Sequence, residues 1–417
     1  MHRPAVRDAR PAAVEPAPAA GPGTAAGRTT PAGPDTAQAP TAHTARTGDT
    51  AEPPPHRPAE VAAAQSAPGA EGAATAADPS ARRPPPARPR ARYTAVDWPQ
   101  LPGWQQDRAA ELWPALRAGC QRPPAGWAGV CARARAFTPP DDGYARDFIE
   151  RELAPWRVET LDGQRDGLAT GYFEPVLEAR RRRQPGFKVP VHRAPPDLAE
   201  RQPWWSRAEL DREPARLRGL EIAWLAHPLD ALLLQVQGSG RLRLTEPDGR
   251  QQTVRVAYAA HNGHPYRSVG RWLVDQGELT LEGASWPAIR AWGERAGPQR
   301  LQQMLQANPR VIFFREEPLA DPRTGPRGAQ GVPLTAGRSV AVDPQALSYG
   351  SVLWLDTTEP LSSTPLQRLV MAQDTGTAIT GAVRIDLFFG LGAPAEALAG
   401  RMKQPLRVWL LWPREAD

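Results

Sequence analysis

Hydrophobic residues are distributed unevenly along this chain of 417 residues. Residues 1–92 contain no Leu, Ile, Phe, Tyr or Trp, whereas all 14 Trp follow them. A segment of this kind buries too little apolar surface to offset the conformational entropy lost on folding. The pattern therefore predicts a disordered N-terminal segment over 1–92, with the folded part beginning at residue 93.

The first folded segment has helical spacing. Apolar positions recur every three to four residues in 107–118 and in 144–153, so both are expected to be helices. Pro114 is expected to kink the first of them. We therefore expect 93–175 to contain a helical lead-in and, from the strand-like run that ends it, the first part of a barrel domain.

Strand patterns dominate the next part of the chain. Two alternating runs flank Pro247-Asp248-Gly249, a turn signal that predicts a hairpin. The sequence predicts a second, smaller β domain over 176–268, inserted into the barrel domain. The expected strands are 168–179, 189–191, 232–240, 241–245 and 252–258.

Residues 269–417 are predicted to begin with helices and to complete the barrel. Helical patterns cover 269–276 and two segments starting near Ser285 and Gly297, the last of which ends at Asn308-Pro309. Short strands are then expected at 311–314, 339–342, 352–355, 369–374, 383–389 and 406–412. Short strands linked by Gly and Pro turns are typical of a barrel. The predicted fold class is therefore mainly β with flanking helices.

Two aspartates interrupt this strand pattern. Asp374 ends one apolar run and Asp386 lies inside the next, with a link rich in Gly and Thr between them. A carboxylate in an apolar strand is costly to bury unless it is paired, hydrogen-bonded or protonated. A capping role or an ion pair with Arg384 is one explanation. The glycines favour a ligand site, because they let a bulky molecule approach the backbone.

The net charge is +6 and the pI is about 9.8, which would suit a polyanionic partner. The excess of Arg is spread along an Ala- and Pro-rich chain, and its one run, Arg180–Arg183, precedes turn residues. We therefore predict no nucleic-acid binding. A basic balance also suits an anionic wall polymer or a membrane surface. No apolar run is long enough to span a bilayer, so no transmembrane helix is predicted.

Cys120 and Cys131 are the only cysteines, and they flank a short loop between two predicted helices. Their spacing fits no zinc motif. Two buried thiols are one interpretation. The other, which we favour, is a local disulfide that stabilises the fold by on the order of 3 kcal/mol in the chain-entropy model. A disulfide would indicate an oxidising compartment.

Other motifs are weaker. Gly238-Ser239-Gly240 is not a nucleophile elbow, because Gln237 stands where that motif needs a glycine. His261 and His264 lack a third ligand nearby, so neither a metal site nor a cofactor is predicted. Polar residues of types that bind sugars cluster in the same Gly-rich segments: Gln237, Ser239, Asn262, Tyr266 and Arg267.

Five groups of residues occur in a characteristic order. They are Thr170-Gly171-Tyr172-Phe173, Val236–Gly240, Asn262–Ser268, Asn308-Pro309 with Phe313-Phe314, and the Asp374–Asp386 block. In order and spacing they resemble the membrane-bound lytic murein transglycosylase A family. The similarity covers about residues 150–413, and the agreement of independent motifs makes it specific.

The resemblance implies a six-stranded double-psi β-barrel interrupted by the second β domain, with a groove between the two. The family's C-terminal unit is named for three aspartates, which correspond to Asp343, Asp374 and Asp386. The link between the last two is one residue longer than the usual pattern, and Thr377 replaces a common glycine.

The resemblance also implies cleavage of the β-1,4 bond between N-acetylmuramic acid and N-acetylglucosamine in peptidoglycan, without water and with a 1,6-anhydro product. Asp386 is the predicted catalytic residue, with Asp374 and Asp343 in support. Its apolar surroundings should raise its pKa. The predicted substrate-binding residues are Thr170, Gly171, Tyr172, Gln237, Gly238, Ser239, Tyr266 and Arg267.

Two other functions stay open at this point. An aspartate pair suits an ordinary glycoside hydrolase, and a barrel with a groove suits a non-catalytic wall-binding module. The expected partners are the glycan strands of peptidoglycan and, beyond them, other cell-wall enzymes. The chain is expected to be a monomer.

An enzyme of peptidoglycan must be exported, yet 1–92 lacks the apolar stretch of a signal peptide and a lipid-attachment cysteine. We expect either a misassigned N-terminal sequence or a low-complexity tether whose signal lies upstream of Met1. Both alternatives predict a periplasmic location, associated with the outer membrane, with Cys120 and Cys131 oxidised.

Overall fold

The computed structural model describes residues 82–414, and the disorder predicted for 1–81 lies outside them. The prediction for 82–92 is wrong, because these residues join the folded part. Arg90 forms an ion pair with Asp343, and Arg92 opens the first strand. Composition missed this segment because guanidinium groups on buried carboxylates hold it, in place of apolar side chains.

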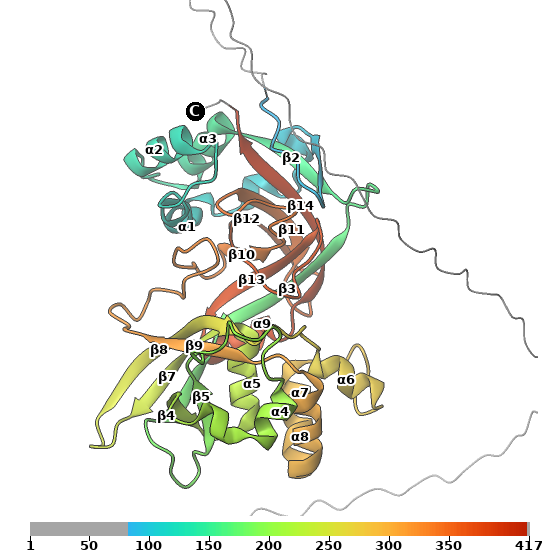
Figure 1. The fold of residues 1–417 in the computed structure, drawn as a ribbon. Coiled ribbons are helices and arrows are strands. Elements are labelled where there is room, and N and C mark those ends of the chain that lie inside the picture. The colour runs from blue at the N-terminus through green and yellow to red at the C-terminus, as the bar shows by residue number, and fades with distance from the viewer. Residues whose placement is uncertain (1–81, 415–417) are drawn as a thin grey trace, which may run out of the picture. The chain divides into compact units, whose positions relative to one another are not determined.

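The larger of the two sheets in residues 82–414 is the predicted barrel (Figure 1). Its strands pair in the order β1-β2-β14-β11-β12-β10-β13-β3, and β3 also pairs with β14, which nearly closes the sheet on itself. They are β1 (Arg92–Ala95), β2 (Leu153–Glu159), β3 (Gly167–Glu174), β10 (Ser339–Val342), β11 (Val352–Thr358), β12 (Pro365–Asp374), β13 (Arg384–Leu391) and β14 (Lys403–Pro413). β1 and β2 were not predicted.

Helices cover one end of this sheet. They are α1 (Trp113–Gly119), α2 (Ala128–Ala136) and α3 (Asp142–Glu152). Their buried residues, among them Leu116 and Phe148, share one hydrophobic core with Trp354 and Leu387 of the sheet. Pro114 does not kink a long helix as predicted. It stands in the first turn of α1, where a missing N–H is tolerated, after a separate 3-10 turn over Ala109–Leu112.

The smaller sheet has the order β5-β6-β4-β7-β8-β9. Its strands are β4 (Val176–Arg180), β5 (Val189–His192), β6 (Glu221–Leu225), β7 (Ser239–Thr245), β8 (Gln251–His261) and β9 (Ile312–Glu317). β7 and β8 form the predicted hairpin. β9 pairs with β8, so this sheet extends past the predicted boundary at 268. Its accompanying helices are α4 (Arg207–Arg212), α5 (Pro228–Gln237), α6 (Val269–Asp275), α7 (Trp286–Arg295) and α8 (Gly297–Ala307).

The strand predicted over 232–240 is wrong in its first part, where the chain forms α5. The helix begins after His227, which accepts a hydrogen bond from the backbone N–H of Leu229, and it has Pro228 in its first turn. A run of leucines hid the helical period from sequence inspection. The helix ends at Gly238, whose φ of 77° is a left-handed conformation that glycine adopts readily.

The two sheets meet where β3 continues into β4. Glu174 at this junction is fully buried, and its carboxylate binds the guanidinium groups of Arg241 and Arg255. A small apolar cluster that includes Phe173 and Leu233 links β3, α5 and the helix α9 (Gly392–Ala399). Charge pairing and apolar packing therefore both hold this junction.

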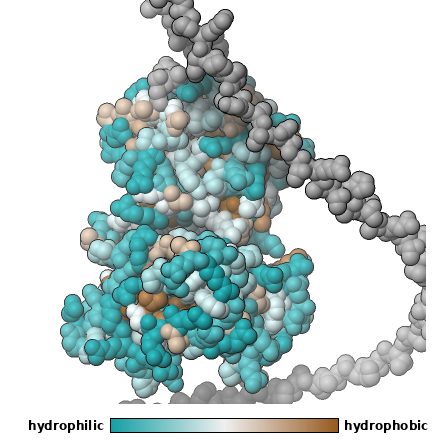
Figure 2. All heavy atoms as spheres, in the orientation of Figure 1, coloured by the Kyte–Doolittle hydropathy of each residue, from teal (hydrophilic) through white to brown (hydrophobic). Residues whose placement is uncertain are grey.

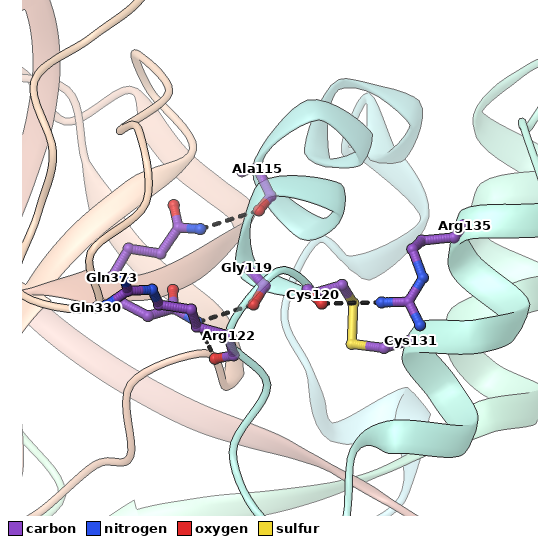
Figure 3. Close-up of a disulfide and its surroundings, with 8 residues drawn as sticks. All are labelled: Ala115, Gly119, Cys120, Arg122, Cys131, Arg135, Gln330 and Gln373. Carbon is purple, nitrogen blue, oxygen red and sulfur yellow. Dashed lines mark hydrogen bonds between the residues drawn. A yellow bond between two sulfur atoms is a disulfide. The ribbon is translucent and has the colours of Figure 1, made fainter.

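A disulfide joins Cys120, at the end of α1, to Cys131 in α2 (Figure 3). This is the alternative that the cysteine spacing favoured. The same turn is held from the barrel side, because Gln330 donates hydrogen bonds to the carbonyl groups of Gly119 and Arg122. Among residues 82–414, no helix has the length and apolar character needed to cross a bilayer.

Candidate active site

The strand order of the barrel brings the two aspartates to either side of one strand. Ala341 of β10 is the register partner of Asp374 on β12 and of Asp386 on β13. Thr170 on β3 is in turn the partner of Asp386. Neighbouring strands lie about 4.8 Å apart, so the Cα atoms of the aspartates are separated by roughly 10 Å.

The carboxyl group of Asp386 receives few hydrogen bonds. Thr170 Oγ1 donates a hydrogen bond of 2.6 Å to its Oδ1, and this is the one hydrogen bond that residues 82–414 give its side chain. Burial raises the pKa of Asp386 to about 6, against the lowering effect of the Thr170 bond and the Arg384 charge. The carboxyl therefore keeps its proton well above the ordinary range of an aspartate, as its apolar surroundings predicted.

Asp374 is also enclosed, but both of its oxygens are occupied. Tyr172 OH donates to Oδ2 over 2.9 Å, and the Ala329 N–H donates to Oδ1 over 2.9 Å. Burial raises the pKa of Asp374, while these donors oppose the rise. Its carboxylate is thus committed to holding β3 and the segment before β10.

Asp343 is an anchor of a different kind. Its carboxylate accepts hydrogen bonds from the backbone N–H groups of Gly381 and Gln345, at 2.7 and 2.9 Å, and from Arg90, at 3.0 Å. Burial alone would raise the pKa of Asp343, but these donors outweigh it and the pKa lies below its usual value. The ionised group ties the link between Asp374 and Asp386 to the start of the fold.

A cavity of about 200 Å³ lies beside Asp386. Residues of both sheets and of the Asp374–Asp386 link line it, and Asp386 supplies the one carboxyl group among them. The lining residues are Gln235, Val236, Tyr266, Asn308, Arg310, Ile312, Gly376, Thr377, Ala378, Ile379, Arg384 and Asp386. A single acid with a raised pKa thus faces a space with mixed polar and apolar walls.

The structure places the predicted binding residues in several different settings. Tyr266 lines the cavity, whereas Thr170 and Tyr172 stand behind it and hold Asp386 and Asp374. Gln237 accepts a hydrogen bond of 3.0 Å from the Phe173 N–H, and Ser239 begins β7; neither lines the cavity. Their arrangement indicates support of the wall more than contact with a ligand.

Three other predicted residues also have structural settings. Gly238 ends α5, and Arg267 is an exposed residue whose backbone N–H binds Asn308. A Cβ atom on Gly171 would lie 2.6 Å from the Phe389 ring, so this position requires glycine for packing. These three residues shape the surroundings of the cavity without lining it.

Several cavity residues escaped prediction as site residues, notably Gln235, Asn308, Arg310 and Arg384. Asn308 could have been identified from the predicted helix end at Asn308-Pro309. A polar residue between a helix and the next strand lies in a loop, where binding residues are common. Asn262, which looked like a sugar-binding residue, is fully buried and binds the carbonyl groups of Trp205 and Pro309.

Two further observations concern the charged groups near the aspartates. Arg384 forms no ion pair with either aspartate within residues 82–414; its guanidinium binds the backbone carbonyl of Leu168. In the same residues, His, Cys, Asp and Glu form no group of three that could hold a metal ion.

Comparison with known proteins identifies the family of the chain. The model described as the MltA specific insert domain matches residues 168–315, a range that ends within β9, and the 3D domain model matches residues 338–412. Membrane-bound lytic murein transglycosylase A of Escherichia coli K12 is 34% identical over 274 residues, 64% of this chain and 72% of that protein.

Solved structures agree with this assignment. Lytic transglycosylase LtgG of Burkholderia pseudomallei is 44% identical, with a TM-score of 0.56 over 81% of this chain and 98% of that one. E. coli MltA with bound chitohexaose is 28% identical, with a TM-score of 0.61 over 78% of this chain and 92% of that one. The chain belongs to the membrane-bound lytic murein transglycosylase A family.

Proposed function

We propose that this protein is a lytic transglycosylase that cleaves the β-1,4 bond between N-acetylmuramic acid and N-acetylglucosamine in peptidoglycan. The main support for this proposal comes from Asp386, which is the single carboxyl group on the cavity wall and has a pKa raised to about 6. The names of the relatives support a murein substrate, and the neighbour with bound chitohexaose supports glycan binding.

In this proposal Asp386 acts first as acid and then as base. Its proton passes to the glycosidic oxygen as the bond from that oxygen to C1 of the muramoyl residue breaks. The sugar's own 6-hydroxyl then attacks C1 and returns its proton to Asp386, which leaves a 1,6-anhydro ring. Because this nucleophile is tethered, its effective concentration is high and no second carboxyl group is required.

The other two aspartates have supporting roles. Asp374 fixes Tyr172 and the Ala329 segment, and Asp343 fixes the link through Gly381. A hydrolase would use a second carboxylate to activate water in the same space. Asp374 does not line the cavity, and both of its oxygens already accept hydrogen bonds. These contacts favour transglycosylation over hydrolysis.

We further propose that the nearly closed sheet is a double-psi barrel and that the cavity belongs to a glycan groove between it and the smaller sheet. Residues from both sheets on the cavity wall support this arrangement. The disulfide supports an oxidising compartment, and the relatives are named membrane-bound, so we place the enzyme in the periplasm at the outer membrane.

Mass spectrometry of the muropeptides released from purified sacculi by the full chain tests this proposal. The expected products end in anhydromuramic acid and are lighter by one water than hydrolysed products. Products with reducing ends would identify a hydrolase instead. Binding to sacculi without any release would identify a wall-binding module.

A further inference from the structure

A second, larger cavity of about 430 Å³ lies beside the smaller sheet. Most of its wall is apolar, and α4, α5, α8 and β5 supply it. Figure 2 shows apolar surface among hydrophilic residues in the region where Figure 1 places β5 and α5. The apolar lining residues include Val189, Leu210, Leu217, Ala231, Leu301 and Leu305.

Arg207 lines this cavity and binds residues of the cavity beside Asp386. Its Nε donates to the Asn308 carbonyl over 3.0 Å, and its Nη2 donates to Gln235 Oε1 and to the Arg310 carbonyl, each over 2.7 Å. All three acceptors belong to residues that line the first cavity. Gln235 lines both cavities, so the two spaces share a wall.

The guanidinium of Arg207 is not fully satisfied. Its Nη1 hydrogens have no acceptor among residues 82–414, and no carboxylate in this range forms an ion pair with it. Burial lowers the pKa of Arg207 to about 10, which still leaves it charged at neutral pH. The negative charge of Asp211 on the same wall opposes this lowering of the pKa, but Asp211 forms no ion pair with Arg207, and the Nη1 donor stays available for a further anion.

The remaining polar groups of the cavity leave a positive balance. Lys188 lies exposed at the rim and has no ion-pair partner within residues 82–414. Asp211 is the one carboxylate on the wall, and it already accepts a hydrogen bond of 2.8 Å from Gln306. Burial lowers the pKa of His192 to about 4, so this side chain is neutral at physiological pH.

We propose that the second cavity binds a carboxylate of the peptide stems that peptidoglycan carries on its muramoyl residues, with Arg207 as the anchor and Lys188 at the rim. This inference rests on the proposed function. A glycan in the first cavity brings its stem close to the shared wall, and an extended peptide advances about 3.3 Å per residue. The apolar walls suit the methyl groups of the stem's alanine residues.

The expected consequence is a preference for peptide-bearing glycans. One charge-assisted hydrogen bond typically changes affinity by roughly tenfold or more. Glycan strands stripped of their stems by an amidase lose that contact. We therefore expect kcat/KM of the full chain to be about tenfold higher for peptide-bearing strands than for stripped ones.

Variants test which residues carry this preference. In Arg207→Lys, the ratio of kcat/KM for peptide-bearing and stripped strands should fall to near one, because the Nη1 donor that is free to bind a carboxylate is lost. Lys188→Gln should lower the ratio by about threefold. Arg183→Gln is the matched control, since Arg183 is exposed, lines neither cavity and also loses one positive charge. Its ratio should stay at the wild-type value.

The outcomes separate the two proposals. Anhydro products from both substrates, with a ratio near one in wild type or unchanged in Lys188→Gln, would overturn the peptide site and leave the proposed function intact. No anhydro product from either substrate would overturn the proposed function itself. Because Arg207 also holds three wall residues, the Lys188 variant keeps the test valid if Arg207→Lys fails to fold.

A binding measurement gives the second arm. The probes are a muramoyl pentapeptide with a free C-terminal carboxylate and the same molecule with that carboxylate amidated. Calorimetry with the full chain should show about tenfold weaker binding of the amide, and Lys188→Gln should narrow the difference. Equal affinities for the two probes would rule out carboxylate recognition.

Discussion

Asp374 and Asp386 flank the same residue of β10, and burial raises the pKa of both, yet their surroundings differ. Asp374 has a donor on each oxygen and lies off the cavity. Asp386 has Thr170 alone and lies on the cavity wall. The number of donors aimed at each carboxyl group thus distinguishes the two aspartates, where burial alone does not.

The largest effect is expected from Asp386→Asn, which removes the proposed proton-transfer group at nearly constant side-chain volume. Turnover of sacculi, measured as anhydromuropeptide release, should fall by about a hundredfold to ten-thousandfold. Activity within threefold of wild type would remove Asp386 from the mechanism and with it the contrast between the two acids.

Stability should change in opposite directions at the two positions. The folded pKa of Asp386 lies above the ordinary value, so its protonated form is favoured at low pH and its ionised form is penalised as pH rises through about 6. At pH 7.5, Asp386→Asn should therefore be more stable than wild type by roughly 1–3 kcal/mol.

The free energy of unfolding of Asp374→Ala should fall by about 2–4 kcal/mol, because the substitution leaves Tyr172 OH and the Ala329 N–H without their acceptor. Urea unfolding of both variants measures this difference, and equal shifts would contradict it.

The pH profile sharpens the assignment of the acid. kcat/KM should fall about tenfold per pH unit above pH 6, as the proton of Asp386 is lost. Thr170→Val removes the hydrogen bond that lowers this pKa, so the alkaline decline in kcat/KM should move to higher pH. Thr170→Ser retains the hydroxyl group, so the decline should stay at the wild-type pH. An unchanged alkaline decline in Thr170→Val would mean that another group controls the pH dependence of kcat/KM.

The smallest effect separates two glutamines of α5. Gln237→Ala should lower stability by about 1 kcal/mol through loss of its bond to the Phe173 N–H, with little change in glycan affinity. Gln235→Ala should weaken glycan binding instead, because Gln235 lines the cavity. Thermal unfolding and sacculus binding of both variants test this difference. A binding defect confined to Gln237→Ala would support the substrate-binding role that the sequence predicts for Gln237.

These two glutamines also show where prediction from sequence ends. Read as a strand, residues two apart share a face, so Gln237 and Gln235 are equivalent. In a helix they point about 160° apart, and in α5 one lines the cavity while the other binds the Phe173 N–H. The wrong local period therefore gave no reason to separate Gln235 from Gln237, and the role predicted for Gln237 stays a prediction.

Local pattern was sufficient elsewhere. The strands that carry Asp374 and Asp386, the β7–β8 hairpin and helices α3, α6, α7 and α8 follow from period and turn residues alone. The pairing of β3 with β14 and the addition of β9 to the smaller sheet did not, because these contacts join residues far apart in sequence. The hydrophobic period predicted the separate strands, and the family resemblance indicated how they combine into a barrel.

The disulfide is connected to the site through the hydrogen bonds of two glutamines. Gln373, next to Asp374, donates to the Ala115 carbonyl in α1, and its own carbonyl accepts from the Gln330 N–H, beside the residue that binds Asp374. The turn that receives Gln330 is the one that Cys120 and Cys131 close (Figure 3). The disulfide and the hydrogen bonds of Gln330 and Gln373 therefore form one connected set of contacts, which links the turn between α1 and α2 to the segment that holds the Asp374 carboxylate.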